Sequence, residues 1–293
     1  MHKGLIIGLN GTELIKEERR WLKEKPPLGV ILFARNIENL EQVRALLDGV
    51  RDCTGEVTWA AIDEEGGRVN RIPWAPFSDR RSAAEYGQLW LEDQEKAEHA
   101  AYQDNLRVGQ ALAKLGFTHN CAPVLDIFHP EGHGIIGERA YADDPGIIAR
   151  LGSACMRGLS DAGIEAVGKH FPGHGRANAD SHVAMPEVDA PLDTLLAEAQ
   201  TFSQLIAAGI KHIMTAHVVY KQVEPQVATL SPFWLKHILR QQFGFTGRIW
   251  SDDLCMKGVG DEIQDAARKA HDAGCDVLLA CEPQGVEKLL GTQ

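Results

Sequence analysis

Short apolar runs alternate with amphipathic segments along the whole chain, and this alternation constrains the fold more than any other feature. Nearly continuous apolar runs predict strands that are covered on both faces, as the strands of a parallel sheet are. Eight such runs begin at Leu5, Gly29, Val57, Thr118, Ile164, Ile210, Gly247 and Cys275. The segments between them space their apolar residues as a helix with one buried face does. The predicted helices cover Glu13–Glu24, Asn39–Asp52, Glu92–Leu115, Pro145–Asp161, Leu192–Ala207, Pro232–Phe243 and Asp261–Ala273, and the tail GVEKLLGTQ has room for only a short eighth helix.

A strand–helix unit repeated eight times is typical of an α/β protein of the (β/α)8, TIM-type barrel class. We therefore expect residues 1–293 to form a single catalytic barrel domain, since such barrels commonly run to roughly 250 residues as one domain. A doubly wound open sheet is the alternative. It is disfavoured because no GxGxxG follows an early strand and because polar residues end many of the predicted strands.

Composition narrows the possible partners and the compartment. The formal net charge is −11 and no basic stripe offsets it, so we expect neither a nucleic-acid nor an anionic-membrane partner. The start MHKGLIIGLNGTELIKEE has only a short apolar run followed by acids, unlike a signal peptide, and no run of about 18 apolar residues occurs. We expect a cytoplasmic protein.

The six cysteines do not suggest disulfides or a zinc site, because none of them forms a CxxC pair. Cys275 and Cys281 lie in one predicted strand, where six residues span about 20 Å, well beyond the reach of a disulfide. We expect reduced, buried thiols.

Ionisable residues end five of the predicted strands. They are Asp63, Asp126, the pair Lys169–His170, His217, and the pair Asp252–Asp253. Because barrel active sites lie at the C-terminal ends of the strands, these side chains predict one convergent polar pocket.

The segment KHFPGHGRANADSH, residues 169–182, is the most informative of these strand ends. Pro172, Gly173 and Gly175 make it an irregular loop. Its Asp180 and His182 form an Asp-x-His pair, in which a carboxylate can orient an imidazole for proton transfer. His170, His174, Asp180 and His182 are also zinc-ligand types, but their spacing matches no HExxH pattern, so we expect no metal. We interpret His174 as structural.

Three other segments carry candidate residues. In WSDDL, adjacent strand residues point to opposite sides, so we assign Asp252 to the pocket and Asp253 to capping the following helix. In IDEEGGRVNRI, Asp63 and the arginines that follow could bind sugar hydroxyls or form a structural ion pair. Arg139 lies in a long, turn-rich connection, GERAYADDP and the residues before it, and such connections are often functional.

Together these segments resemble the β-N-acetylglucosaminidases of glycoside hydrolase family 3, most closely the single-domain bacterial enzymes of peptidoglycan recycling. The resemblance runs from about Leu28 to the end. KHFPGHG followed by DSH is its most specific element, and DEEGGRV and SDDL support it.

The resemblance implies a retaining mechanism without cofactor or metal. Asp252 would be the nucleophile, and His182, oriented by Asp180, would be the acid/base. The residues that match the sugar-binding positions are Asp63, Arg71, Arg139, Lys169 and His170, whereas Arg68 is taken as structural. The implied substrate is N-acetylglucosamine linked β-1,4 to anhydro-N-acetylmuramic acid that carries a peptide.

Three alternatives remain at this stage. A phosphorylase would transfer the sugar from the same intermediate to phosphate. A metal-dependent hydrolase would lose activity with a chelator. For a non-catalytic sugar-binding barrel, Asp252→Ala would leave every measured activity unchanged.

Overall fold

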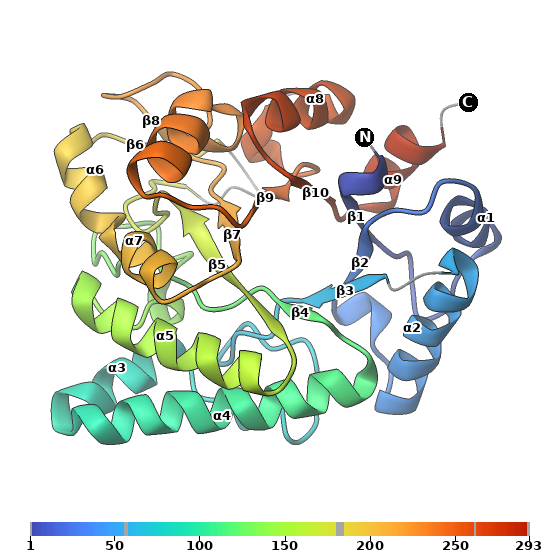
Figure 1. The fold of residues 1–293 in the computed structure, drawn as a ribbon, viewed down its shortest axis with the longest axis horizontal. Helices are drawn as coiled ribbons and strands as arrows, with labels where there is room; N and C mark the ends of the chain where they lie inside the picture. Colours follow the sequence, from blue (N-terminus) through green and yellow to red (C-terminus); the bar gives the residue numbers. More distant parts are fainter. Residues whose placement is uncertain (1, 56–57, 180–184, 261, 292–293) are drawn as a thin grey trace.

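The computed structural model describes residues 2–55, 58–179, 185–260 and 262–291. Eight parallel strands close into a barrel in the order β1-β10-β9-β7-β5-β4-β3-β2, which confirms the predicted fold (Figure 1). They are β1 (Leu5–Gly8), β2 (Gly29–Leu32), β3 (Trp59–Ile62), β4 (His119–Asn120), β5 (Glu165–Phe171), β7 (His212–Thr215), β9 (Arg248–Asp253) and β10 (Val277–Ala280). Each strand overlaps one predicted run. The first and last strands, β1 and β10, pair in parallel and close the barrel.

Helices surround the barrel on its outside (Figure 1). They are α1 (Lys16–Glu24), α2 (Leu40–Thr54), α3 (Ala83–Glu92), α4 (Gln94–Leu115), α5 (Pro145–Asp161), α6 (Leu192–Glu198), α7 (Gln200–Ala207), η5 (Phe233–Gln242), α8 (Ile263–Ala273) and α9 (Pro283–Leu290). One-turn helices are η1 (His2–Gly4), η2 (Ala34–Asn36), η3 (Gly137–Arg139), η4 (Ala228–Leu230) and η6 (Lys257–Val259). Within the described residues, no helix combines the length and apolar character that crossing a bilayer requires.

Local sequence signals set several helix ends. The Asn39 side chain accepts the Gln42 N–H at 2.9 Å and starts α2, which ends before Gly55 at a φ of 68°. Such a positive φ costs glycine little because it has no Cβ. Asp144 caps α5 in the same way, and Pro145, which has no N–H to satisfy, takes its first position.

The structure differs from the predicted elements in three places. The segment Glu92–Leu115 is shorter as a helix, because Asp93 caps α4 and ends a separate helix, α3, that the sequence analysis missed. The segment Leu192–Ala207 is two helices, α6 and α7, which meet at Ala199. A small two-stranded sheet of β6 (Glu187–Val188) and β8 (Val219–Tyr220) was also not predicted.

Apolar side chains fill two separate layers, which explains why the strands are apolar on both faces. The outer layer lies between strands and helices. The inner layer fills the barrel and consists of Ile6, Ile31, Ala61, Cys121, Val167, Met214, Trp250, Val277, Leu279 and Cys281. All six cysteines are free thiols, and four of them are buried.

The bottom of the barrel, where the strands begin, holds a cluster of two tryptophans and two histidines. The ring centroids of Trp59 and His119 are 4.2 Å apart, and those of His119 and His212 are 4.9 Å apart. The Trp250 Nε1–H donates to His212 Nδ1 at 3.0 Å. Burial lowers the pKa of His119 to about 3 and that of His212 to about 4, so both rings are neutral in the folded protein.

Candidate active site

A cavity of about 520 Å³ opens at the C-terminal ends of the barrel strands. Its lining includes every predicted sugar-binding residue and the predicted nucleophile, namely Asp63, Arg71, Arg139, Lys169, His170 and Asp252. The sequence argument from strand ends therefore brought together residues that lie up to 189 positions apart in the chain, from Asp63 to Asp252.

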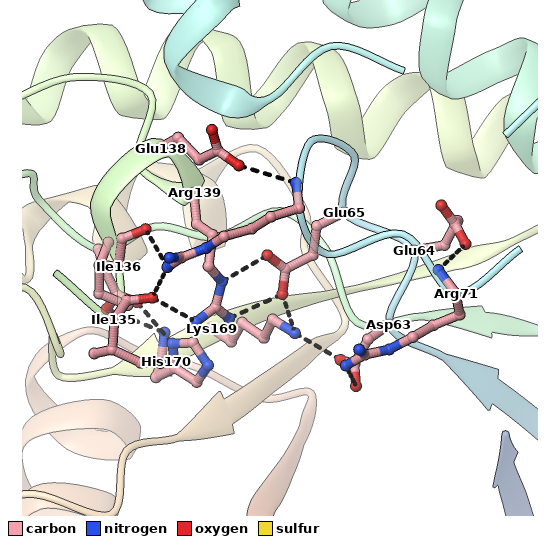
Figure 2. Close-up of polar contacts among 12 residues, drawn as sticks. Asp63, Glu64, Glu65, Arg71, Ile135, Ile136, Glu138, Arg139, Lys169 and His170 are labelled. Atoms are coloured by element: carbon pink, nitrogen blue, oxygen red, sulfur yellow. Dashed lines mark hydrogen bonds and ion pairs between the residues drawn. The ribbon is translucent and has the colours of Figure 1, made fainter. Parts of the chain in front are cut away.

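Lys169 lies at the centre of an ion-pair network on one wall of the cavity (Figure 2). Its Nζ is 2.7 Å from Asp63 Oδ1 and 2.7 Å from Glu65 Oε1, and its side chain is 3% exposed. Burial opposes the charge, but the carboxylates of Asp63 and Glu65 outweigh it and raise the pKa of Lys169. Lys169 is therefore a buried cation, and two of its three N–H groups are used.

Glu65 joins Lys169 to Arg139 and is the site residue that the sequence analysis missed. Arg139 contacts it through two bonds, Nε to Oε2 at 2.8 Å and Nη2 to Oε1 at 2.9 Å. Burial would raise the pKa of Glu65, but Arg139 and Lys169 lower it well below its usual value. Glu65 lies three residues beyond the end of β3, and no sequence pattern separates it from its neighbour Glu64.

Arg71 lies beside Asp63, with Nη2 3.5 Å from Asp63 Oδ2 and the guanidinium 5.9 Å from the centre of the Phe33 ring. Its backbone N–H donates to Glu64 Oε2 at 3.0 Å. Glu64 is fully buried, and burial raises its pKa to about 7 although Arg80 opposes this. Arg71 is thus held from its backbone while its side chain lines the cavity.

His170 is fixed by Asp126, a strand-end acid to which the sequence analysis gave no role in the site. Asp126 Oδ2 is 2.6 Å from His170 Nδ1, and Asp126 Oδ1 accepts the backbone N–H of His174 at 2.7 Å. Burial would raise the pKa of Asp126, but His170 lowers it below the usual value. The carboxylate is therefore ionised and can only accept hydrogen bonds.

Asp252 and Asp253 both line the cavity, because the register of β9 against β10 shifts at this point and re-aims the strand end. The expectation that Asp253 caps the following helix is wrong. Its carboxylate instead accepts the N–H groups of Cys255 at 3.0 Å and Cys281 at 2.9 Å. The physical reason is distance along the chain, since a turn and η6 separate Asp253 from α8, whose cap is Glu262.

The nucleophile candidate, Asp252, has few bonds of its own. Its Oδ1 accepts the Asp253 N–H at 2.8 Å. Burial would raise the pKa of Asp252, but nearby His217 and His170 lower it, so the group is a carboxylate. His217 is held between Thr229 Oγ1 at 2.7 Å and the Asp253 carbonyl oxygen at 2.9 Å.

In the part of the chain that the structure describes, the guanidinium of Arg68 contacts backbone carbonyl groups, while its backbone N–H donates to Glu138 Oε1 at 2.9 Å. Its Nη2 donates to the carbonyl oxygens of Gly134 at 3.1 Å and Ile136 at 3.2 Å, and also to that of Ile135. These bonds hold the loop before Arg139, in keeping with a structural residue.

Asp180 and His182 lie outside the described residues. The described start of their loop is tied to three neighbouring segments: Tyr220 donates to the Gly173 carbonyl oxygen at 2.6 Å, His133 N–H donates to the Ala177 carbonyl oxygen at 3.0 Å, and Arg176 pairs with Glu198. Among the described side chains, no group of three or more His, Cys, Asp or Glu is arranged to hold a metal ion.

Comparison with known proteins identifies the family. The family model "Glycosyl hydrolase family 3 N terminal domain" matches residues 6–292. A β-hexosaminidase of Methylobacillus flagellatus is 40% identical, with 98% of this chain and 82% of the relative aligned. One of Thiobacillus denitrificans is 38% identical over 98% of this chain and 80% of its own length. A crystal structure of NagZ from Neisseria gonorrhoeae in complex with N-trifluoroacetyl-D-glucosamine superposes with a TM-score of 0.91 at 37% identity, covering 99% of this chain and 85% of that one.

The barrel and its polar pocket define a glycoside hydrolase, and the chain belongs to glycosyl hydrolase family 3. Within that family it is a β-N-acetylhexosaminidase.

Proposed function

We propose that the protein is a cytoplasmic, retaining exo-β-N-acetylglucosaminidase of peptidoglycan recycling. It removes terminal, non-reducing N-acetylglucosamine from β-1,4-linked (anhydro)muropeptides. Asp252 attacks the anomeric carbon and forms a covalent glycosyl-enzyme. His182, oriented by Asp180, first protonates the leaving oxygen and then activates the water that hydrolyses the intermediate.

One observation carries the assignment of Asp252. The other carboxylates at the strand ends are occupied: those of Asp63 and Glu65 by cations, that of Asp126 by histidine and backbone N–H groups, and that of Asp253 by two N–H groups. Asp252 Oδ2 has no hydrogen-bond partner among the described residues, and it is not enclosed. A nucleophile needs a free lone pair that faces the substrate.

The ion-pair network supports sugar binding by Asp63, Arg71, Arg139, Lys169 and His170. Hydroxyl groups of a sugar both donate and accept, so they fit a wall that mixes carboxylates with N–H donors. Among the described residues, Lys169 pairs with Asp63 and Glu65, which leaves one N–H for a ligand. The fixed ion pairs hold these groups in place before the sugar arrives. The N-acylated glucosamine in the complex of the Neisseria gonorrhoeae protein supports a sugar of the same class here.

Mass spectrometry of a trapped intermediate tests the mechanism. The protein is incubated with a fluorinated N-acetylglucosaminide that slows the second step, digested with trypsin, and fragmented to locate the added mass. Label on Asp252 is expected. Label on Asp253, which shares the same tryptic peptide, or on a glutamate would overturn the assignment.

The substrate and the reaction type need separate assays. Release of N-acetylglucosamine from its β-1,4 conjugate with anhydro-N-acetylmuramyl peptide should exceed release from chitobiose. Adding phosphate should leave the product as free sugar, and sugar 1-phosphate as the main product would replace hydrolysis with phosphorolysis.

A further inference from the structure

Two histidines share one wall of the cavity and one carboxylate. His174 is 3% exposed, and its ring centroid lies 5.8 Å from that of His170 at an angle of 65°. Asp126 holds both residues, because Oδ2 meets the His170 ring and Oδ1 accepts the backbone N–H of His174. Both side chains line the cavity that also contains Asp252.

Asp126 sets the tautomer of His170. An ionised carboxylate only accepts, so the His170 Nδ1 that lies 2.6 Å from it carries the hydrogen. Nδ1 is thus occupied, and Nε2 is the ring nitrogen that remains for a ligand.

His174 also leaves one ring nitrogen for a ligand. Burial lowers its pKa to about 4, so the ring is neutral. Its Nδ1 is enclosed and bonds no other described residue. Nε2 is not among the enclosed nitrogens, so it is the nitrogen that can meet a ligand in the cavity.

We propose that His174 contacts the sugar, and that His170 and His174 together bind one hydroxyl group through their remaining ring nitrogens. A hydroxyl offers one O–H and two lone pairs, so it satisfies both nitrogens at once. The inference rests on the proposed function as an N-acetylglucosaminidase, and it identifies a specificity-determining residue that the sequence analysis treated as structural.

A purely structural role explains the ring of His174 less well. Its backbone N–H already fixes the loop through Asp126. Its ring nitrogens bond no other residue of the described chain, so packing alone gives no reason for a polar ring at this place. Asp252 is near enough to interact electrostatically with His174, which places the ring close to the proposed reaction centre.

The test measures coupling between a residue and a hydroxyl. The kcat/KM of the full chain is measured with 4-nitrophenyl N-acetyl-β-glucosaminide and with its 3-, 4- and 6-deoxy analogues. His174→Phe keeps a ring but removes its nitrogens, whereas His174→Gln keeps a polar group. The exposed His237, on η5, gives the matched control His237→Phe.

For one deoxy analogue, the wild type should lose at least about tenfold in kcat/KM, as expected for a lost hydrogen bond in an enclosed site. His174→Phe should lose a similar factor on the parent substrate but almost nothing further on that analogue. His174→Gln should recover part of the loss, and His237→Phe should behave as the wild type. Equal losses on the parent and all three analogues in His174→Phe would make the residue structural and overturn the proposal.

Calorimetry with N-acetylglucosamine and its deoxy forms separates this inference from the proposed function, because binding needs no turnover. Binding without release of nitrophenol would contradict the proposed hydrolysis, while the same coupling in Kd would still support the histidine pair. Uniform loss of affinity in His174→Phe would contradict the pair, whatever the activity. If His174→Phe does not fold, His174→Gln and His174→Asn are compared with the wild type, and an unchanged deoxy penalty in both would again overturn it.

Discussion

The two ends of the barrel bury histidines in opposite ways. At the bottom, His119 and His212 pack against Trp59 and Trp250, and burial is the main cause of their low pKa values. At the top, His170 is bonded to an ionised carboxylate, and a buried lysine is neutralised by Asp63 and Glu65. The difference teaches that burial does not decide whether a group is charged; the partner that the fold places beside it does.

Substitutions at the two ends of the barrel should therefore affect different properties of the protein. Changes at the top should reduce turnover, because they remove groups that face the cavity. Changes at the bottom should alter stability and its pH dependence, because the residues there do not line the cavity.

The largest effect should come from Asp252→Asn, which removes the proposed nucleophile without changing its size. We expect kcat/KM to fall by at least about 10³-fold. The free energy of unfolding in urea should change little, because only one N–H of Asp253 bonds the side chain. A kcat/KM within tenfold of the wild-type value would mean that another carboxylate is the nucleophile.

Glu65→Gln should lower both the stability and the kcat/KM of the protein. Lys169 and Arg139 would lose a shared counter-ion, and breaking a buried ion pair from one side typically costs about 3–5 kcal/mol. We expect a clear loss of stability in urea together with a kcat/KM lowered about 100-fold, or 2.7 kcal/mol. Glu41→Gln on the exposed surface of α2 is the control. A variant with the stability and kcat/KM of the wild type would contradict the role of Glu65 as the shared counter-ion of Lys169 and Arg139.

His119→Leu should make the protein more resistant to acid. The unfolded residue takes up a proton below pH 6.5, whereas the folded one does so only near pH 3. Between those values the unfolded state binds more protons, so stability is lost as the pH falls. The wild type should lose about 1–3 kcal/mol relative to the variant between pH 6.5 and pH 4.5. Urea titrations at three pH values measure this, and parallel curves would contradict it.

The smallest effect concerns Glu64, whose titration has the opposite sign. Burial raises its folded pKa to about 7, above the ordinary value of a glutamate, so the folded state binds more protons in that window and stability is lost as the pH rises through it. Glu64→Gln should remove this loss and be stabilised relative to the wild type at pH 8 by about 1 kcal/mol more than at pH 5. Its KM should stay normal, because an amide oxygen can still accept the Arg71 N–H.

A comparison with Glu64→Ala sharpens this last prediction. The alanine variant cannot hold Arg71, so its KM should rise about fivefold, the value of one hydrogen bond. A variant lacking both Glu64 and the Arg71 side chain should then be no worse than Arg71→Ala alone. Additive effects would show that Glu64 acts independently of Arg71.

The apolar runs predicted the barrel, because strands of a parallel sheet are covered on both faces. The convergence of strand ends in this fold predicted four of the cavity residues, Asp63, Lys169, His170 and Asp252. Arg71 and Arg139 were implied by the family resemblance. It could not resolve a helix pair as close as α3 and α4, whose boundary depends on the single cap Asp93. The register between neighbouring strands could not be predicted from the sequence either. The shift between β9 and β10 brings both Asp252 and Asp253 to the cavity, and no pattern within one strand reveals how its neighbour aligns.

The hydrogen-bond and ion-pair partners of the site residues could not be predicted either. Asp126 and Glu65 each lie in a segment that the sequence analysis quoted, yet their roles depend on which distant cation or ring they meet. Lys169 and Arg139 come from different strand–helix units, so only the closed barrel shows that one carboxylate serves both.

Closure of the barrel by its last strand also has a consequence for biosynthesis. The Cys281 N–H that follows β10 holds the Asp253 carboxylate, and the Cys281 carbonyl oxygen accepts a hydrogen bond from Arg35 beyond β2. A growing polypeptide therefore carries Asp63, Lys169 and Asp252 long before it can set them against one another. The ribosome must release β10 before the catalyst exists, so an unfinished chain should be inert.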